Sequence, residues 1–295
     1  MLFDIHNIIF DDLKSEFLER KEISLAVARL DKIHPVVSGN KLFKLHYFLE
    51  AFQSGSYKSI QTFGGAYSNH LVATAFACQY LNIPCTGIIR GEEPRMLSSS
   101  LQQCLSYGMG LQFVNRSFYA GVAHQQPGDS NILIIPEGGF HPLGAKGASL
   151  IMDSITSKNA THVCLPVGTA TTLAGIAQKI AADQTLIAIP VLKGFNDVDQ
   201  RLTLLNGKTR NARLDVWPDY HFGGYAKYTS ELIGFMNNIF RQYQLPTDFV
   251  YTGKMMFGIF DAISKDRFQP GAKIMCMHTG GLQGNASLPK GSLIF

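Results

Sequence analysis

The 295-residue sequence has few charged residues, and those it has are not grouped by sign. Asp, Glu, Lys and Arg make up 16% of the chain, and the net charge at pH 7 is only +4. The densest basic stretches, LERKE at 18–22 and SKDRF at 264–268, are interleaved with acids. Nucleic-acid binding usually requires a basic patch or stripe. The composition therefore argues against a nucleic-acid partner.

Long apolar runs, paired cysteines and metal-site spacings are also missing. No apolar stretch approaches the roughly 20 residues that cross a bilayer, and residues 1–21 lack a signal-peptide layout. No His, Cys and Asp constellation has the spacing of a metal site, so we expect no metal and no membrane. From the scattered thiols we expect buried, reduced cysteines and a cytoplasmic location. The five are Cys78, Cys85, Cys104, Cys164 and Cys276.

The two common phosphate fingerprints of nucleotide enzymes are absent. No GxxxxGK[ST] motif occurs, and the nearest run, GFHPLGAK, places Lys146 one position too late. No strand-to-helix turn fits GxGxxG either. A nucleotide-dependent enzyme, which would need such a fingerprint, is therefore disfavoured.

Helical and strand-type segments alternate along most of the chain, and this order predicts parallel sheets flanked by helices, an α/β fold. Apolar runs such as ILII and LIAIPVL fit strands that are covered on both faces. Helices are expected at 41–52, 68–82, 96–108, 144–156, 171–183, 227–243 and 256–266, and strands at 59–63, 84–90, 111–115, 131–137, 161–167, 185–192 and 272–279. Ligands of such folds bind beyond the carboxyl ends of the strands, where helices begin.

Two lysines stand three positions apart in SGNKLFKL, residues 38–45. We expect Asn40 to cap a helix that begins at Lys41, with Lys44 one turn later on nearly the same face. Both could be solvated surface lysines. The location favours another interpretation, because the positive helix end and a second ammonium both lower the pKa of Lys41. The pattern therefore indicates a neutral, nucleophilic amine.

The second unusual turn is TFGGAYSNH, residues 62–70. Gly64 and Gly65 allow backbone geometry that is closed to other residues. Ser68 and Asn69 then supply a hydroxyl and an amide at the head of the next helix. The stretch could be only a tight turn with a polar cap, and its functional interpretation is a pocket for a carboxylate and a planar polar ligand.

The third turn, LPVGTATTLAG at 165–175, favours an anion. Consecutive backbone amides at a helix start attract phosphate, and hydroxyls add donors. The residues after Gly168 are small or carry hydroxyls, and none is acidic: Thr169, Ala170, Thr171 and Thr172.

A single ligand would explain all three turns: the activated amine, the pocket for a planar polar group and the loop that favours phosphate. Pyridoxal phosphate needs an amine for its aldehyde, a cup for its phosphate and cover for its ring. The three turns therefore predict a pyridoxal 5'-phosphate site in which Lys41 is the covalent partner.

Seven motifs then occur in one order between about Leu30 and the C-terminus: SGNKLFKL, GGAYSNH, PEGGFHPLGAKG, VGTATTLAG, GGYAK, VYTGKMMFG and HTGG. This set resembles the pyridoxal-phosphate enzymes of the 1-aminocyclopropane-1-carboxylate deaminase / D-cysteine desulfhydrase family, which have the tryptophan synthase β-like fold. The resemblance implies two domains, each with a mainly parallel sheet: a large one formed by 1–45 and 148–295, and a small one formed by 46–147. It also implies a homodimer.

The resemblance implies a role for each matching residue. Lys41 would carry the cofactor, and Lys44 would contact its phosphate. Ser68 would assist proton transfer and, with Asn69 and His70, bind the substrate carboxylate. Asn69 would also hydrogen-bond the hydroxyl of the cofactor ring.

The remaining cofactor contacts are implied in the same way. Tyr225 and Tyr251 would line the substrate side, and Tyr251 would protonate or position the leaving group unless it is only a packed aromatic. Thr252 would contact the pyridine nitrogen, and Thr279 would lie near the pyridine edge. The phosphate loop would be formed by Thr169, Ala170, Thr171 and Thr172.

The residue at position 252 separates two activities within this resemblance. Ring-opening deaminases of the family resemble one another in having a glutamate there, whereas this chain has a neutral threonine. A weaker electron sink suits loss of a thiol better than opening of a carbon ring. We therefore expect elimination from a small amino acid such as D-cysteine. The alternatives are 1-aminocyclopropane-1-carboxylate deamination, or a homologue that binds amino acid or cofactor without turnover.

Overall fold

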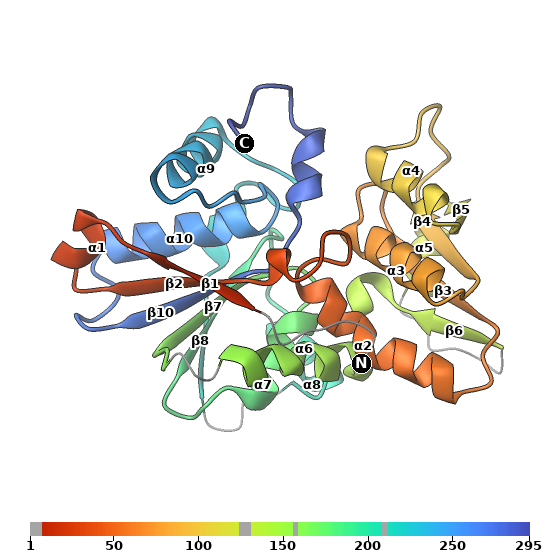
Figure 1. Ribbon diagram of the computed structural model, residues 1–295, viewed down its shortest axis with the longest axis horizontal. Coiled ribbons are helices and arrows are strands. Elements are labelled where there is room, and N and C mark those ends of the chain that lie inside the picture. Colours follow the sequence, from red (N-terminus) through yellow and green to blue (C-terminus); the bar gives the residue numbers. More distant parts are fainter. Residues whose placement is uncertain (1–7, 124–130, 156–158, 208–211) are drawn as a thin grey trace.

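The computed structural model of the chain describes residues 8–123, 131–155, 159–207 and 212–295. These residues form two β-sheets of six and four strands (Figure 1). Every strand pair is parallel except β1 with β2, which confirms the predicted α/β fold. The larger sheet has the order β1 (Ile9–Leu13), β2 (Ser24–Arg29), β10 (Lys273–His278), β7 (His162–Val167), β8 (Thr185–Pro190) and β9 (Arg213–Val216). The smaller has the order β5 (Gly110–Val114), β4 (Cys85–Arg90), β3 (Ser59–Gly64) and β6 (Ile132–Ile135).

Helices cover both faces of the larger sheet and flank the smaller one (Figure 1). One side of the larger sheet carries α6 (Pro142–Ile155), α7 (Thr171–Lys179) and α8 (Val198–Leu204), and the other carries α9 (Ser230–Tyr243) and α10 (Thr252–Ser264). Helix α2 (Asn40–Ser54) lies between the sheets, where it packs on α6, α3 and β6. The smaller sheet is flanked by α3 (Asn69–Tyr80), α4 (Ser99–Ser106) and α5 (Arg116–Val122), and the short α1 (Glu16–Arg20) joins β1 to β2. The described residues also form 3-10 turns at Leu30–Lys32, Glu137–Gly139, Pro218–His221 and Leu282–Ser287.

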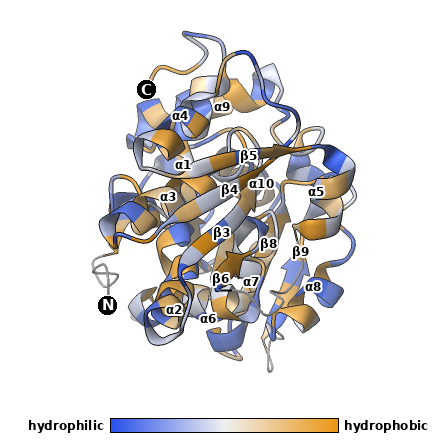
Figure 2. Cartoon of the chain, turned by 90° about the vertical axis from the view of Figure 1, so that its right-hand side faces the viewer, coloured by the Kyte–Doolittle hydropathy of each residue, from blue (hydrophilic) through white to orange (hydrophobic). Residues whose placement is uncertain are grey.

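The strands of the larger sheet are buried because helices cover them on both sides. In β7 and β8 every residue after the first is buried, as expected for near-continuous apolar runs in a parallel sheet. Helix α9, by contrast, buries Leu232, Met236 and Ile239 on one side and exposes polar residues on the other. Figure 2 shows the hydrophobic strands of the smaller sheet with hydrophilic residues on the surrounding helices and loops.

Glycines allow α2, α6 and α7 to pack closely. A Cβ at Gly147 in α6 would overlap the carbonyl oxygen of Phe43 in α2, and one at Gly175 in α7 would overlap that of Ala145. The resulting apolar core is continuous between the sheets, since Leu133 of β6 and Leu165 of β7 belong to the same cluster. The N-terminus of α2 is therefore fixed against both sheets.

The predicted domain boundaries, between 45 and 46 and between 147 and 148, fall inside α2 and α6. Both helices pack in the core that the two sheets share, so these boundaries stay a prediction. The five cysteines are buried and unpaired, as predicted. In the described part of the chain, no helix combines the length and apolar character needed to cross a membrane.

Candidate active site

The start of α2 differs from the prediction in one respect. Asn40 does not cap the helix from outside. Gly39, with φ of 69°, precedes it, and Asn40 is its first residue. A Cβ at Gly39 would overlap the backbone oxygen of Thr279, so only glycine allows this approach. The amide of Asn40 instead donates a hydrogen bond of 2.7 Å to Thr172 Oγ1.

Lys41 lies at the second position of α2. Burial of its ammonium lowers the pKa from 10.5 to about 8, although the carboxylate of Asp248 acts in the opposite direction. Its Nζ lies 5.6 Å from the centroid of the Tyr251 ring. Desolvation therefore favours the neutral amine that the sequence predicts, with an aromatic wall beside it.

Lys44, one turn along α2, is buried, and its Nζ donates a hydrogen bond of 2.7 Å to the carbonyl of Gly138. Burial lowers the pKa of Lys44 well below its usual range, and the charge of Lys41 adds to this effect. Lys44 thus ties α2 to the turn that follows β6. Gly138 in turn borders the phosphate loop, because a Cβ there would lie 2.8 Å from Thr169 Cγ2.

Ser68 and Asn69 lie at the start of α3. Ser68 is the N-cap, and its Oγ accepts a hydrogen bond of 3.3 Å from the backbone N–H of Leu71. Its hydroxyl hydrogen remains available to donate. Asn69 Oδ1 is buried without a hydrogen-bond partner among the described residues. Such an orphaned acceptor is costly unless a ligand satisfies it.

His70 has a fixed tautomer in this arrangement. Thr62 Oγ1 donates its one hydrogen to the carbonyl of Ile135 at 2.9 Å, so His70 Nε2 must donate to Thr62 Oγ1 at 3.0 Å. Nδ1 is then a buried acceptor with no partner in the described ranges. Burial, helped by the charges of Lys44 and Lys41, lowers the pKa of His70 to about 3. His70 is therefore neutral, and its Nδ1 can accept a hydrogen bond but cannot donate one.

The threonine-rich turn leads from β7 into α7. Ala170 is the N-cap and adopts the left-handed conformation with φ of 69°. The hydroxyls of Thr169 and Thr171 lie 2.9 Å apart, and Thr172 accepts from Asn40. A helix start with free backbone amides and hydroxyls, and no acid in its first turn, suits an anion.

Tyr225 and Tyr251 form an aromatic pair, with centroids 6.1 Å apart and ring planes at 72°. Burial raises the pKa of Tyr251 well above its usual range, and Tyr225 adds to the effect. Tyr225 itself is 46% exposed, so it lies at the outer side of the pair. Tyr251 also borders the phosphate loop, because a Cβ at Gly168 would lie 3.3 Å from its ring.

The hydroxyl of Thr252 makes both of its hydrogen bonds with Asp248, a residue that was not among the predicted site residues. Its hydroxyl donates a hydrogen bond of 2.7 Å to Asp248 Oδ1 and accepts one of 2.8 Å from the Asp248 backbone N–H. Asp248 is completely buried and also accepts from the backbone N–H groups of Val250, Tyr251 and Thr252. An aspartate just before a helix is a known capping pattern, so this signal was present in TDFVYTG.

Thr279 and its neighbour His278 are buried at the end of β10. The backbone oxygen of Thr279 accepts a hydrogen bond of 3.3 Å from the N–H of Asn40, which joins β10 to α2. His278 Nε2 donates to the carbonyl of Pro246 at 2.8 Å and is a structural residue.

Arg90, at the end of β4, also lies near the TFGGAYSNH turn although the sequence analysis did not select it. Its Nη2 is 3.4 Å from the point where a Cβ at Gly65 would stand, and its guanidinium lies 5.7 Å from the Tyr119 ring. A Cβ at Gly139 would lie 3.6 Å from Lys44 Cβ and 3.9 Å from His70 Cε1, so the TFGGAYSNH turn also borders α2. With the Asn40–Thr172 and Lys44–Gly138 hydrogen bonds, this contact brings all three predicted turns to one site.

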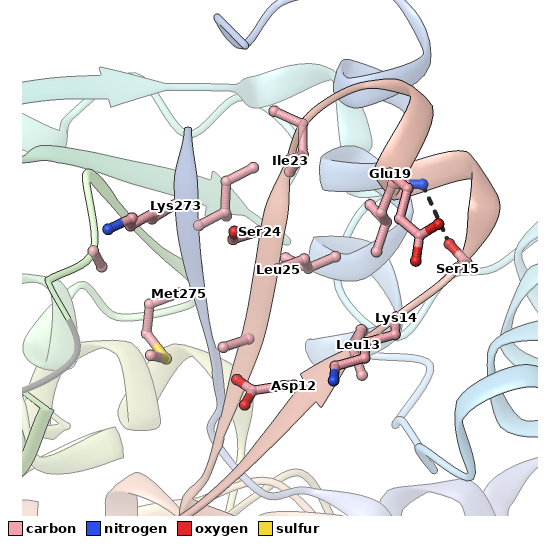
Figure 3. Close-up of a pocket in the computed structure, with 14 residues that line it drawn as sticks. Asp12, Leu13, Lys14, Ser15, Glu19, Ile23, Ser24, Leu25, Lys273 and Met275 are labelled. Atoms are coloured by element: carbon pink, nitrogen blue, oxygen red, sulfur yellow. Dashed lines mark hydrogen bonds between the residues drawn. The ribbon is translucent and has the colours of Figure 1, made fainter. Parts of the chain in front are cut away.

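A separate pocket of about 510 Å³ lies elsewhere, beside β1, β2 and β10 (Figure 3). Ser15, Leu25 and Met275 are among its lining residues, and none of the predicted site residues lines it.

Residues 13–280 match the family described as "Pyridoxal-phosphate dependent enzyme". Because this match spans most of the chain, the protein belongs to that family, as its motifs predict. Proteins named "Putative 1-aminocyclopropane-1-carboxylate deaminase" from Pyrococcus horikoshii and Pyrococcus abyssi are both 26% identical to it. The first alignment covers 84% of this chain and 81% of the relative, and the second covers 89% and 86%. These names agree with the 1-aminocyclopropane-1-carboxylate deaminase / D-cysteine desulfhydrase family that the motifs resemble.

Solved structures show the same fold. A structure described as an ACC deaminase homologue aligns with a TM-score of 0.78 and 23% identity, covering 94% of this chain and 90% of that one. Threonine deaminase isoform 2 from Solanum lycopersicum aligns with a TM-score of 0.65 and 16% identity, covering 92% and 83%.

The residues present fit pyridoxal phosphate. The buried amine of Lys41, the orphaned acceptor of Asn69 and the acid-free start of α7 would serve as a covalent partner, a ring contact and a phosphate cup. Thr172 Oγ1 joins the start of α7 to Asn40, next to Lys41, and Lys44 joins α2 to the carbonyl of Gly138.

Proposed function

We propose that the protein is a pyridoxal-phosphate lyase that eliminates the β-substituent of a small amino acid, with D-cysteine as the substrate and pyruvate, ammonia and sulfide as the products. The residues proposed to hold the cofactor are Lys41, Lys44, Asn69, Thr169, Ala170, Thr171, Thr172, Tyr225, Thr252 and Thr279.

The observation that carries this proposal is the environment of Lys41. Its amine is desolvated, has a pKa of about 8 and lies 5.6 Å from the Tyr251 ring. An amine with a lowered pKa can act both as a nucleophile towards a carbonyl and as a general base. A solvated surface lysine would have neither property.

When bound, pyridoxal phosphate supplies a carbonyl for amines and a ring that withdraws electrons from the α-carbon of the amino acid. Lys41 Nζ, once released, removes the α-proton. The Ser68 hydroxyl donates to the substrate carboxylate, since its oxygen already accepts from Leu71 and its hydrogen is free. Tyr251 keeps its proton because burial raises its pKa, so it can donate to a departing sulfur. His70, which is neutral, can orient a donor at Nδ1 but does not transfer a proton.

The neutral side chain of Thr252 supports elimination rather than ring opening. Position 252 carries no charge, where the resemblance implies a glutamate for ring-opening deaminases. A neutral group at this position stabilises a negative charge on the ring less than a charged pair would, which suits substrates that lose a good leaving group.

Ring opening of 1-aminocyclopropane-1-carboxylate to 2-oxobutyrate and ammonia is the second candidate. The names of the two Pyrococcus relatives favour it. A cytoplasmic homodimer remains the predicted setting for either reaction.

The experiment compares keto-acid release from D-cysteine, L-cysteine, D-serine and 1-aminocyclopropane-1-carboxylate by the yellow, cofactor-loaded protein. Release of pyruvate and sulfide from D-cysteine in excess of the other products is expected. Release of 2-oxobutyrate alone would select the second candidate, and a loaded protein that turns over none of the four would reject both.

A further inference from the structure

Lys254 is a completely buried lysine in the first turn of α10 that the proposed reaction does not use. Its Nζ donates hydrogen bonds of 2.8 Å to the carbonyl of His221 and 2.7 Å to the carbonyl of Gly224. Both acceptors belong to the segment that leads from β9 to Tyr225. The lysine thus joins α10 to a backbone about 30 positions away in sequence.

No carboxylate of the described residues lies within ion-pair distance of Lys254. Burial lowers its pKa to about 8, and the more distant Asp248 only partly opposes this. Burying an amine without a close counter-charge is costly, and two good hydrogen bonds offset only part of that cost. The contribution of Lys254 is therefore geometric, since it fixes where two carbonyls lie.

The segment that Lys254 holds is strained. Phe222, Gly223, Gly224 and Ala226 all have positive φ, at 51°, 93°, 118° and 54°. For Phe222 and Ala226, which have a Cβ, this conformation is unfavourable. Such a backbone persists only where its surroundings over-determine it. Within the turn itself, the backbone N–H of Gly224 also donates to His221, at 3.0 Å.

The strained turn presents Tyr225, which packs against Tyr251 with centroids 6.1 Å apart. Tyr251 is the N-cap of α10. The first turn of α10 therefore fixes the positions of both rings. It carries Tyr251 directly, and it holds Tyr225 through Lys254. We propose that Lys254 is a positioning residue that holds the strained turn and thereby keeps Tyr225 against Tyr251 at the wall of the active site.

This inference rests on the proposed function, and its first test does not require turnover. In the cofactor-loaded protein, Lys254→Met keeps an apolar side chain of similar length and removes both donors. Lys58→Met, at an exposed position just before β3 of the smaller sheet, is the matched control. We expect hydrogen exchange in residues 217–228 to accelerate at least about tenfold in Lys254→Met and to stay unchanged in Lys58→Met.

The second test asks whether Lys254 acts through Tyr225. The loss of kcat/KM for D-cysteine caused by Lys254→Met is measured in the wild-type background and again in Tyr225→Ala. We expect at least about a tenfold loss in the first background and less than about a twofold further loss in the second, because the lysine then has no ring to position. If Lys254→Met does not fold, Lys254→Gln, which keeps one short donor, should give smaller changes of the same sign.

Unchanged exchange at 217–228, or equal losses of kcat/KM in both backgrounds, would overturn the inference. A wild-type protein that binds no pyridoxal phosphate would instead overturn the proposed function. In that case the same exchange comparison, made on the cofactor-free protein, still decides whether Lys254 holds the turn.

Discussion

The side chain of Asn40 donates a hydrogen bond of 2.7 Å to Thr172 Oγ1, across 132 positions of sequence. Both residues are buried. This contact joins the helix start that carries Lys41 to the helix start of the threonine-rich turn, so the amine and the phosphate cup are held at a fixed separation.

Thr172→Val should lower both stability and cofactor affinity. Valine has the shape of threonine but leaves the Asn40 amide buried without this acceptor, at a cost of about 1–3 kcal/mol. Chemical unfolding and titration with pyridoxal phosphate measure the two effects. Thr203→Val makes the same exchange at an exposed position of α8 and should change stability by less than about 0.5 kcal/mol. Equal, small effects of the two variants would show that the Asn40 contact is unimportant.

Ser68→Ala should separate a capping role from a catalytic one. Ser68 and Thr229 are both N-caps whose hydroxyls accept a backbone N–H at 3.3 Å. Losing either cap should cost about 1 kcal/mol in unfolding experiments. Only Ser68→Ala should also reduce kcat/KM, by about 10²-fold or more if the hydroxyl assists proton transfer. If Ser68→Ala is as active as Thr229→Ala, Ser68 is only a cap.

Ala170→Gly should be much less harmful than the same change elsewhere in α7. Ala170 has φ of 69°, which glycine adopts without strain, so a relief of about 1–2 kcal/mol should offset the added freedom of the unfolded chain and the loss of a buried methyl group. The midpoint of thermal unfolding should therefore change by less than about 2 °C. Ala177→Gly, at a buried position of the same helix without a positive φ, should lower stability by at least about 1 kcal/mol. Equal falls in Tm for the two variants would contradict the assigned backbone conformation.

The rate at which cofactor-free protein attaches pyridoxal phosphate should depend on the pKa of Lys41. With a pKa of about 8, roughly one tenth of the amine is neutral at pH 7, compared with about one in three thousand at 10.5. Protonation blocks attachment, so the rate should rise about tenfold per pH unit below 8 and level off above it. The same reaction with butylamine corrects for titration of the cofactor. A corrected rate still rising tenfold between pH 9 and 10 would contradict a desolvated Lys41.

The sequence predicted the fold and the three turns because both depend on local signals. Apolar runs and glycine-rich turns mark where strands end and helices begin. Ser68 follows β3 of the smaller sheet and Ala170 follows β7 of the larger one, whereas Lys41 lies at a helix start that no strand directly precedes. The local signals therefore predicted each turn, and one shared ligand, not a common sheet edge, predicted their grouping.

Other features could not be predicted, because they depend on contacts distant in sequence. The sequence predicted Asn40 as a helix cap, because nothing near it in the chain indicates Thr172 as its hydrogen-bond partner. Nothing in the sequence near Lys254 indicates its partners, because the carbonyls it binds lie about 30 residues earlier. Asp248 had a local signal as a helix cap, but its electrostatic effect on Lys41 required the fold.

The most direct test of the central claim is to map where pyridoxal phosphate attaches. Protein loaded with the cofactor is reduced with borohydride, which makes the linkage permanent, and is then digested and analysed by mass spectrometry. The account predicts a single modified residue, Lys41, and loss of both the label and the yellow colour in Lys41→Ala. A label on another lysine, or a protein that remains unlabelled and colourless, would contradict it.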